Sequence, residues 1–170
     1  MNEDIMAGLV NFNEVWSRVG SPMPGYAVGA SCPLPAAGAG EDEKARLERF
    51  MQGEAADGDL YGRLAKCVSG KARELMVRAA SDEKCHLKKL QLEYFLLAGN
   101  SYAASFRPKP VNGVLMALRN AYLDEKAGGA EYKTASANAG SAELRELYAR
   151  LAEDESRHAE YMRHILACTM

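Results

Sequence analysis

The sequence DEKCH at residues 82–86 returns later in the chain as DESRH at residues 154–158, and this repetition decides the predicted fold. Each segment contains a Glu-x-x-His motif. Residues at this spacing lie about 60° apart around an α-helix, so the glutamate and the histidine of each motif share one face. The chain has three histidines, and two of them belong to these motifs. We therefore predict two related helices with the same pair of potential metal ligands.

The segments that precede the two motifs repeat as well. Tyr61 follows Glu54 at the same spacing as Tyr132 follows Glu125, and this spacing places each pair on one face of a helix. Self-similarity of this kind indicates that the chain contains two structurally equivalent halves.

Helix-forming residues dominate the chain from Glu41 onward, whereas glycine and proline are confined to a few breaks. Between these breaks we predict four long helices, at residues 42–67, 71–98, 112–138 and 141–167. Ser141 is a suitable N-cap for the last of them. The first and third connections are short, so the helices that they join are expected to form two antiparallel hairpins.

The middle connection, GNSYAASFRPKPV at residues 99–111, is much longer. Nearly extended, it would reach about 43 Å, whereas a helix of this size is about 40 Å long, so it can cross the whole bundle. We therefore predict an all-α, ferritin-like four-helix bundle with a long crossover between its second and third helices. An ordinary up-down-up-down bundle with one long loop is the alternative.

The first forty residues differ in composition from the rest of the chain. Residues 5–19 can form a short amphipathic helix, and residues 20–40 are rich in glycine and proline, which predicts an irregular arm. We expect residues 1–40 to pack as this helix and arm on a bundle domain formed by residues 41–170.

Composition excludes several classes of function. The 170-residue chain has a formal net charge of −2, without the basic excess of proteins that bind nucleic-acid phosphates. No apolar run approaches the roughly 20 residues that span a bilayer, and the N-terminal segment lacks the features of a secretory signal. The four cysteines form no Cys-x-x-Cys pair, which argues against a zinc ribbon or a rubredoxin-type iron centre. We expect a soluble, cytoplasmic protein that binds neither nucleic acid nor a membrane.

The repeated polar residues are predicted to face the interior, because apolar residues flank them at helical spacing. Counting from the helix ends places the glutamates of all four helices at one level of the bundle. The six residues of this predicted cluster are Glu54, Glu83, His86, Glu125, Glu155 and His158. Unpaired buried carboxylates are costly, so the cluster must be protonated, ion-paired or bound to metal. A hydrogen-bonded polar network in a structural bundle is the alternative.

Metal binding explains the cluster best. The matching inward positions hold no lysine or arginine, whereas two divalent cations would neutralise four glutamates. One glutamate from each of two helices, with a Glu-x-x-His motif from each of the other two, is the ligand set of di-iron and di-manganese carboxylate bundles. Carboxylate and imidazole ligands favour iron or manganese over metals that prefer thiolates. We predict two Fe ions, with Mn as the alternative.

Residues 42–167 resemble the ferritin-like superfamily, and the combination of Glu-x6-Tyr with Glu-x-x-His is most similar to the di-iron domain of rubrerythrins. The resemblance implies that Glu83 and Glu155 bridge the two metals. It also implies that each metal takes one terminal glutamate and one histidine, from the set Glu54, Glu125, His86 and His158. Rubrerythrins are peroxide-reducing enzymes that typically use ferrous iron.

Two departures from the rubrerythrin pattern bear on this activity. Rubrerythrins carry an extra carboxylate three residues after the glutamate of the third helix, and here that position is Gly128. Asp57 stands at the equivalent position of the first half, either as an alternative carboxylate ligand or as an acid that only neighbours the site. Rubrerythrins usually also carry a rubredoxin domain. Without one, the electrons are expected to come from an external donor protein.

Two tyrosines and two glycines accompany the predicted ligands. Tyr61 and Tyr132 are expected to donate hydrogen bonds to the metal-bound glutamates and so fix their orientation. Gly58 and Gly129 each weaken a helix by about 1 kcal/mol relative to alanine. We expect them either to leave space for a small oxidant or to permit close helix packing.

Together these features predict a rubrerythrin-like oxidoreductase that reduces peroxide or dioxygen with electrons from an external donor. We expect it to work as a homodimer. A ferroxidase or iron-handling protein, for which the metal is itself the substrate, is the first alternative. A non-catalytic bundle with a structural metal is the second.

Overall fold

The computed structural model describes residues 42–169, and this part of the chain consists of helices and loops without a strand. Its helices are α2 (Glu43–Leu64), α3 (Gly70–Ala98), α4 (Val114–Asn138) and α5 (Ala142–Thr169). The four predicted helices are therefore confirmed, with ends that differ by a few residues. The helix and arm predicted for residues 1–40 lie outside the described residues. Within residues 42–169, no helix combines the length and apolar composition of a membrane-spanning segment.

Local sequence explains where two of the helices end or begin. Gly99 terminates α3 in the left-handed conformation, with φ of 73°, and its amide donates a hydrogen bond to the carbonyl oxygen of Phe95 at 2.9 Å. Ser141 caps the start of α5 as predicted, because its hydroxyl accepts a hydrogen bond from the Leu144 amide at 3.1 Å. These residues fix the points at which the chain leaves the first hairpin and begins the last helix.

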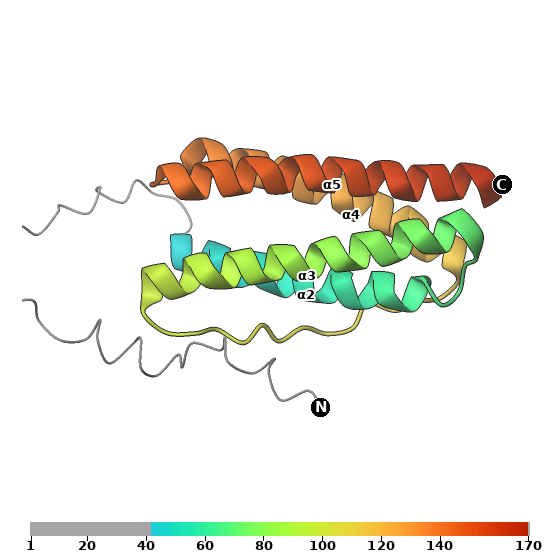
Figure 1. Ribbon diagram of the computed structural model, residues 1–170, viewed down its shortest axis with the longest axis horizontal. Coiled ribbons are helices and arrows are strands. Elements are labelled where there is room, and N and C mark those ends of the chain that lie inside the picture. The colour runs from blue at the N-terminus through green and yellow to red at the C-terminus, as the bar shows by residue number, and fades with distance from the viewer. Residues whose placement is uncertain (1–41, 170) are drawn as a thin grey trace, which may run out of the picture. The chain divides into compact units, whose positions relative to one another are not determined.

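The helices form two antiparallel hairpins, α2 with α3 and α4 with α5, joined by the crossover at residues 99–113. Figure 1 shows the crossover running along the bundle, so that α4 begins at the end opposite to the one where α3 finishes. This connectivity confirms the predicted ferritin-like bundle with a long crossover. It excludes the up-down-up-down alternative, which would start α4 beside the end of α3.

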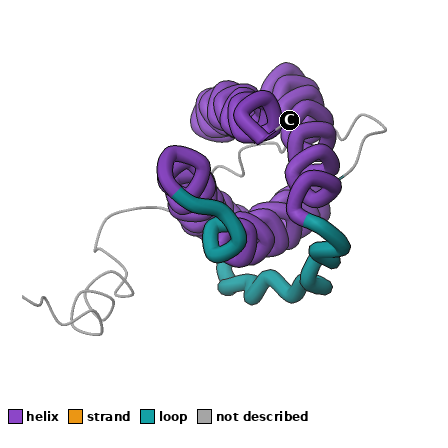
Figure 2. The backbone as a smooth tube through the Cα atoms, turned by 90° about the vertical axis from the view of Figure 1, so that its right-hand side faces the viewer, coloured by secondary structure: helices purple, strands orange, loops and turns teal. Residues whose placement is uncertain are grey.

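The two hairpins face each other across the middle of the bundle. Figure 2 shows the four helices around a common centre, with the crossover on the outside. The helix α3 packs against α5. On the other side α2 faces α4, and side chains from the two helices meet there at the site described below.

Two hydrophobic clusters fill the bundle on either side of its middle. Members of the first include Leu64, Met76, Leu118 and Met162, and members of the second include Met51, Leu90, Tyr148 and Leu151. These side chains are fully buried, and burial of each aliphatic one contributes about 1.5–3 kcal/mol to stability. The predicted polar cluster lies between these two apolar clusters, so packing on both sides fixes its position along the bundle.

Candidate metal centre

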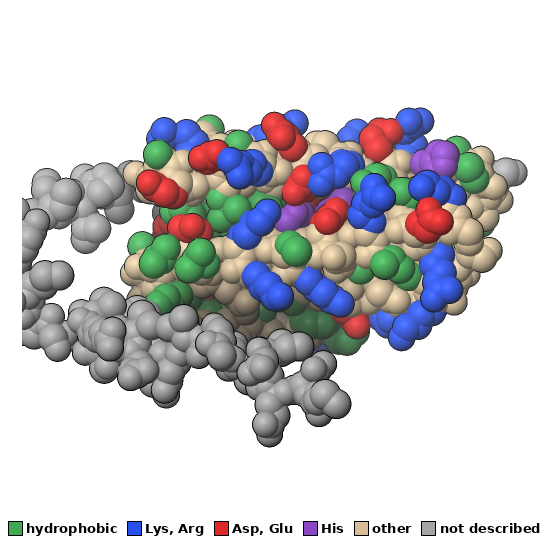
Figure 3. Space-filling view, in the orientation of Figure 1, with side chains coloured by type: hydrophobic (Ala, Val, Ile, Leu, Met, Phe, Trp, Pro, Cys, Tyr) green, Lys and Arg blue, Asp and Glu red, His purple; other side chains and the backbone are tan. Residues whose placement is uncertain are grey.

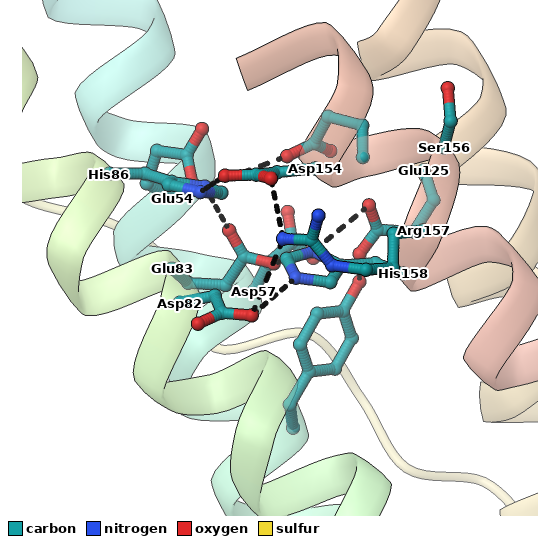
Figure 4. Close-up of polar contacts among 12 residues, drawn as sticks. Glu54, Asp57, Asp82, Glu83, His86, Glu125, Asp154, Ser156, Arg157 and His158 are labelled. Atoms are coloured by element: carbon teal, nitrogen blue, oxygen red, sulfur yellow. Dashed lines mark hydrogen bonds and ion pairs between the residues drawn. The ribbon is translucent and has the colours of Figure 1, made fainter. Parts of the chain in front are cut away.

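The six predicted polar side chains come together from all four helices in the middle of the bundle. Figure 4 shows five of them, Glu54, Glu83, His86, Glu125 and His158, pointing toward one another. All are buried, and even the most exposed of them, Glu155, has an exposed fraction of only 8%. The structure therefore brings together the residues that the repeat placed at one level.

The cluster divides into two groups that can each hold a metal ion. The groups are Glu54, Glu83, His86 and Glu155 on one side and Glu83, Glu125, Glu155 and His158 on the other. Within each group, one ligand atom from every residue lies within 4.8 Å of those of the others. Glu83 and Glu155 belong to both groups, which is the arrangement expected of carboxylates shared by two ions.

Each histidine presents its Nδ1 atom to the glutamates. His86 Nδ1 lies 3.2 Å from Glu54 Oε2 and 3.1 Å from Glu83 Oε2. His158 Nδ1 lies 2.8 Å from Glu83 Oε1 and 3.7 Å from Glu125 Oε2. Both Nδ1 atoms therefore point at the centre of the cluster, where a neutral imidazole can bind a metal.

The other ring nitrogen of each histidine contacts an aspartate from the opposite hairpin, where α3 meets α5. His86 Nε2 lies 2.9 Å from Asp154 Oδ2, and His158 Nε2 lies 3.3 Å from Asp82 Oδ2. Arg157 pairs with Asp154 at 2.5 Å and lies 3.9 Å from Asp82. Figure 3 shows acidic and basic side chains along this seam. An Nε2–H that donates to a carboxylate fixes the ring and leaves the Nδ1 lone pair for a cation.

Sequence reasoning assigned no role to Asp82 or Asp154, although a signal for both was present. Each directly precedes the glutamate of a Glu-x-x-His motif. The pKa of Asp154 lies below its usual value: burial alone would raise it, but hydrogen bonds from His86 and Arg157 outweigh that effect. Asp154 is therefore an ionised acceptor for the histidine of the other hairpin.

Two tyrosines orient the glutamates, again from the opposite hairpin. The Tyr61 hydroxyl donates a hydrogen bond to Glu125 Oε1, and the Tyr132 hydroxyl donates one to Glu54 Oε1. Burial, together with the negative charge of the neighbouring carboxylates, raises the pKa of both tyrosines well above the usual value. Both hydroxyls therefore remain protonated donors, in the positions that the sequence predicted for them.

The electrostatics of the cluster show how strongly it attracts positive charge. Burial, and then the nearby charge of Glu83, raise the pKa of Glu54 to about 8. Burial alone would lower the pKa of His86, but its hydrogen bonds to Glu54 and Glu83 raise it to about 10. The pKa of Glu155 is also raised, by burial and by the charge of Glu125. Without a cation, the cluster compensates its carboxylates by holding protons.

Several buried atoms of the cluster lack a hydrogen-bond partner, which provides a test of whether a metal fits. These atoms are Glu83 Oε1, Glu125 Oε2, Glu155 Oε1 and His158 Nδ1. Buried polar atoms are rarely left unpaired, and each of these can donate a lone pair to a cation when it is deprotonated. A set of carboxylates and imidazoles without thiolates suits iron or manganese. The residues therefore fit a bound metal ion.

A cavity of about 300 Å³ reaches the carboxylates from the side of the bundle where α2 faces α4. Its wall includes Glu54, Glu125, Glu155 and Gly128. A Cβ atom at Gly128 would lie 3.0 Å from Glu155 Oε2, so the glycine makes room for this carboxylate. The sequence suggested only that a ligand is missing at residue 128. The structure shows that a shared carboxylate uses the space.

The other two glycines beside the cluster serve helix packing. A Cβ atom at Gly58 would lie 3.4 Å from Glu83 Cβ, and one at Gly129 would lie 3.5 Å from Glu155 Cβ and from the Ala152 carbonyl oxygen. Gly58 also lines a second cavity, of about 550 Å³, whose wall includes Glu54, and Gly129 lines a third, of about 290 Å³, beside Ser156. The contacts therefore bear out close packing within each hairpin, and at Gly58 there is also open space beside Glu54.

Asp57 lies at the edge of the same cavity and pairs with a lysine. Lys109, from the crossover, places its Nζ atom 2.7 Å from Asp57 Oδ1 and 3.0 Å from Asp124 Oδ2. Burial raises the pKa of Asp57 to about 6, and the charge of Lys109 opposes this rise. Asp57 belongs to neither of the two potential metal-binding groups, so its position fits an acid that neighbours the site rather than a ligand.

Comparisons with known proteins identify no relative of this chain, so the assignment of function depends on the geometry of the site. No protein-family model matches the chain, and neither the curated proteins nor the solved structures searched give a match. The buried glutamate and histidine cluster, which is compatible with a di-iron site, is therefore the principal guide to function.

Proposed function

We propose that the chain is a dinuclear iron oxidoreductase that resembles rubrerythrin and reduces peroxide or dioxygen with electrons from an external donor protein. The observation that carries the proposal is the pair of buried ligand groups that share Glu83 and Glu155. Two ferrous ions held there would supply one electron each to a small oxidant. The proposal also includes a homodimer as the working form.

The chain's own residues would prepare the site for this chemistry. Glu83 and Glu155 would be shared by the two ions, and Glu54 and Glu125 would each bind one. The tyrosine hydroxyls restrict how these last two carboxylates rotate. The aspartates that contact the histidine Nε2 atoms keep both Nδ1 atoms directed inward. The chain therefore supplies ligands whose orientation is set before the metals bind.

The surroundings of the cluster favour a small, polar reactant. Apolar clusters close the bundle above and below the site, and the cavity between α2 and α4 gives access to it. Seven of the residues in the cavity wall are carboxylic acids, so the wall does not resemble the apolar pocket that holds a large organic substrate. Hydrogen peroxide is small and forms hydrogen bonds, which suits this environment.

The decisive experiment is metal analysis followed by rapid kinetics. Protein purified without added metal is expected to contain iron, and metal-free protein is expected to bind two ferrous ions per chain under anaerobic conditions. Peroxide should then oxidise the bound iron faster than dioxygen does, and a reductant should restore turnover. Metal binding without any redox response would contradict the proposal and support a structural role for the metal.

Ferroxidase activity is a second candidate, and the acidic cavity wall favours it, because such a wall attracts cations towards the cluster. The two functions differ in the fate of iron. A ferroxidase would continue to oxidise ferrous iron added well beyond two ions per chain. The proposed oxidoreductase would stop at two and then require a reductant.

A further inference from the structure

The seam between α2 and α4 differs from the other contacts of the bundle, because the cavity that Glu83, Glu125 and Glu155 line lies within it. Close helix packing occurs within each hairpin and between α3 and α5. The carboxylic acids that line the cavity are Glu54, Asp57, Glu83, Asp124, Glu125, Glu131 and Glu155. Asp124 and Glu131 are exposed whereas Glu83 and Glu125 are buried, so the acids extend from the surface to the cluster.

Two basic residues contact the outer acids of this cavity. Arg49 pairs with Glu131 at 2.5 Å, connecting α2 to α4. Lys109 connects the same two helices through Asp57 and Asp124, at 2.7 Å and 3.0 Å. Lys109 therefore lies between an aspartate of α2 and an aspartate of α4. Arg49 pairs with a glutamate across the same seam.

The backbone at Lys109 is held independently of its side chain. Arg63 Nη2 donates a hydrogen bond to the Lys109 carbonyl oxygen at 2.7 Å. Pro108 and Pro110 flank the lysine, and their rings restrict the backbone further. The side chain itself has an exposed fraction of 33%, so its ammonium group has access to solvent. The ammonium can leave the two aspartates without a movement of the crossover.

The inner wall of the cavity carries acceptors that are ready for a cation. Glu83 Oε1, Glu125 Oε2 and Glu155 Oε1 are buried and lack hydrogen-bond partners. All three residues line the cavity that Asp57 and Asp124 line further out. A cation released from the outer pair of acids would therefore meet further carboxylate oxygens on the way in, of which Glu125 Oε2 and Glu155 Oε1 have no partner closer than 3.7 Å.

We propose that Asp57 and Asp124 form a transit site through which divalent cations reach the buried cluster, and that the Lys109 ammonium holds this site until a cation displaces it. The inference rests on the proposed function only in requiring that the cluster binds metal. A divalent ion interacts twice as strongly as an ammonium with the same carboxylates at equal distance, so it can compete with the ammonium for them. The acidic wall would then concentrate cations at the cluster.

The test is the rate at which metal-free protein takes up Co²⁺, followed by the visible absorption of the bound ion after rapid mixing. The double variant Asp57→Asn/Asp124→Asn should load about tenfold more slowly than the unmodified chain, since the negative charge of the transit site is gone. Lys109→Met should load a few-fold faster, because no ammonium competes with the ion. The number of ions bound at equilibrium should be the same in all three proteins.

Controls separate this inference from other effects. Lys71→Met removes a lysine that pairs with Glu74 on the surface of α3, at 3.1 Å, and should load at the unmodified rate. Asp124→Asn alone should give an intermediate rate, because it keeps the Asp57–Lys109 pair. Circular dichroism should confirm that each variant is folded.

The possible outcomes are distinct. If the double variant loads at the unmodified rate, the transit site is wrong even though the cluster binds metal. If Lys109→Met slows loading, the lysine does not compete with the ion and that part of the proposal is overturned. If the unmodified chain binds no Co²⁺ at equilibrium, the proposed function itself fails.

Discussion

The two seams between the hairpins surround the same cluster but differ in construction. Where α3 meets α5, the aspartate contacts of both histidines and the nearby Arg157 fill the space between the helices. Where α2 faces α4, a cavity of about 300 Å³ reaches the carboxylates and ion pairs lie at its edge. The first seam orients the two histidines, whereas the second holds the tyrosine contacts of Glu54 and Glu125 and also gives access to the carboxylates.

The largest effect is expected from a residue that both seams depend on. Glu83→Gln removes a carboxylate common to both ligand groups and should weaken metal binding by about 3–5 kcal/mol, which is about 10²- to 10⁴-fold in affinity. Titration of metal-free protein with Co²⁺ measures this. Glu74→Gln, an exposed glutamate on the same helix, is the matched control and should bind metal normally. Equal affinity of the two variants would contradict the assigned ligand groups.

The charge of the metal-free cluster should make its stability depend on pH. The pKa of Glu54 is raised from 4.5 to about 8, so its protonated carboxyl group contributes fully to the stability of the folded protein below pH 4.5. This contribution is lost as the pH rises through 8. The pKa of His86 is raised from 6.5 to about 10, so its contribution to the stability of the folded protein is complete below pH 6.5 and is lost as the pH rises through 10. Each proton bound only in the folded state changes stability by up to about 1.4 kcal/mol per pH unit.

Urea unfolding of metal-free protein at pH 6, 7 and 8 checks this dependence. The free energy of unfolding should fall as the pH rises, because Glu54 and His86 change in the same direction. Saturating metal should remove most of the fall and should raise stability by about 2.7 kcal/mol at a concentration 100 times the dissociation constant. Stability that rises with pH in the metal-free protein would contradict the buried cluster.

The orienting role of the α3–α5 seam can be tested at its aspartates. Asp154→Asn weakens the acceptor of His86 Nε2 and should reduce metal affinity by about 10- to 100-fold, as loss of such partners does elsewhere. Asp82→Asn should do the same through His158. Competition with a chelator gives the affinity. We predict a change in loading rate only for variants of Asp57 and Asp124. If the Asp82 and Asp154 variants change the loading rate but not the affinity, the proposed difference between the two seams is wrong.

The smallest predicted effect compares two adjacent glycines of α4. Gly128→Ala places a Cβ atom 3.0 Å from Glu155 Oε2, so this carboxylate must shift, and metal affinity should fall by about two- to tenfold. Gly129→Ala meets only ordinary contacts near 3.5 Å and should leave affinity unchanged. Both variants should gain up to about 1 kcal/mol of stability from helix propensity. Equal affinities would show that Glu155 does not need the space at Gly128.

The sequence predicted the fold and the six clustered residues because helical spacing determines both. Repetition of Glu-x-x-His and of Glu-x6-Tyr sets which side chains share a face, and the long middle connection sets the crossover. Spacing along one helix does not reveal contacts between hairpins, so the link from Asp154 to His86 was missed. The position of Lys109 depends on how an irregular loop crosses the bundle, and no periodic pattern describes such a loop.

The four hydrogen bonds that orient the tyrosine-bound glutamates and the two histidines all pass from one hairpin to the other. Neither hairpin therefore contains a finished half of the site. This reciprocity is the one that two copies of a single helical hairpin would have about an exact two-fold axis. The chain therefore has the architecture of two hairpin subunits joined by residues 99–113. Because of this link, the two hairpins meet during the folding of one chain and not by association of two molecules.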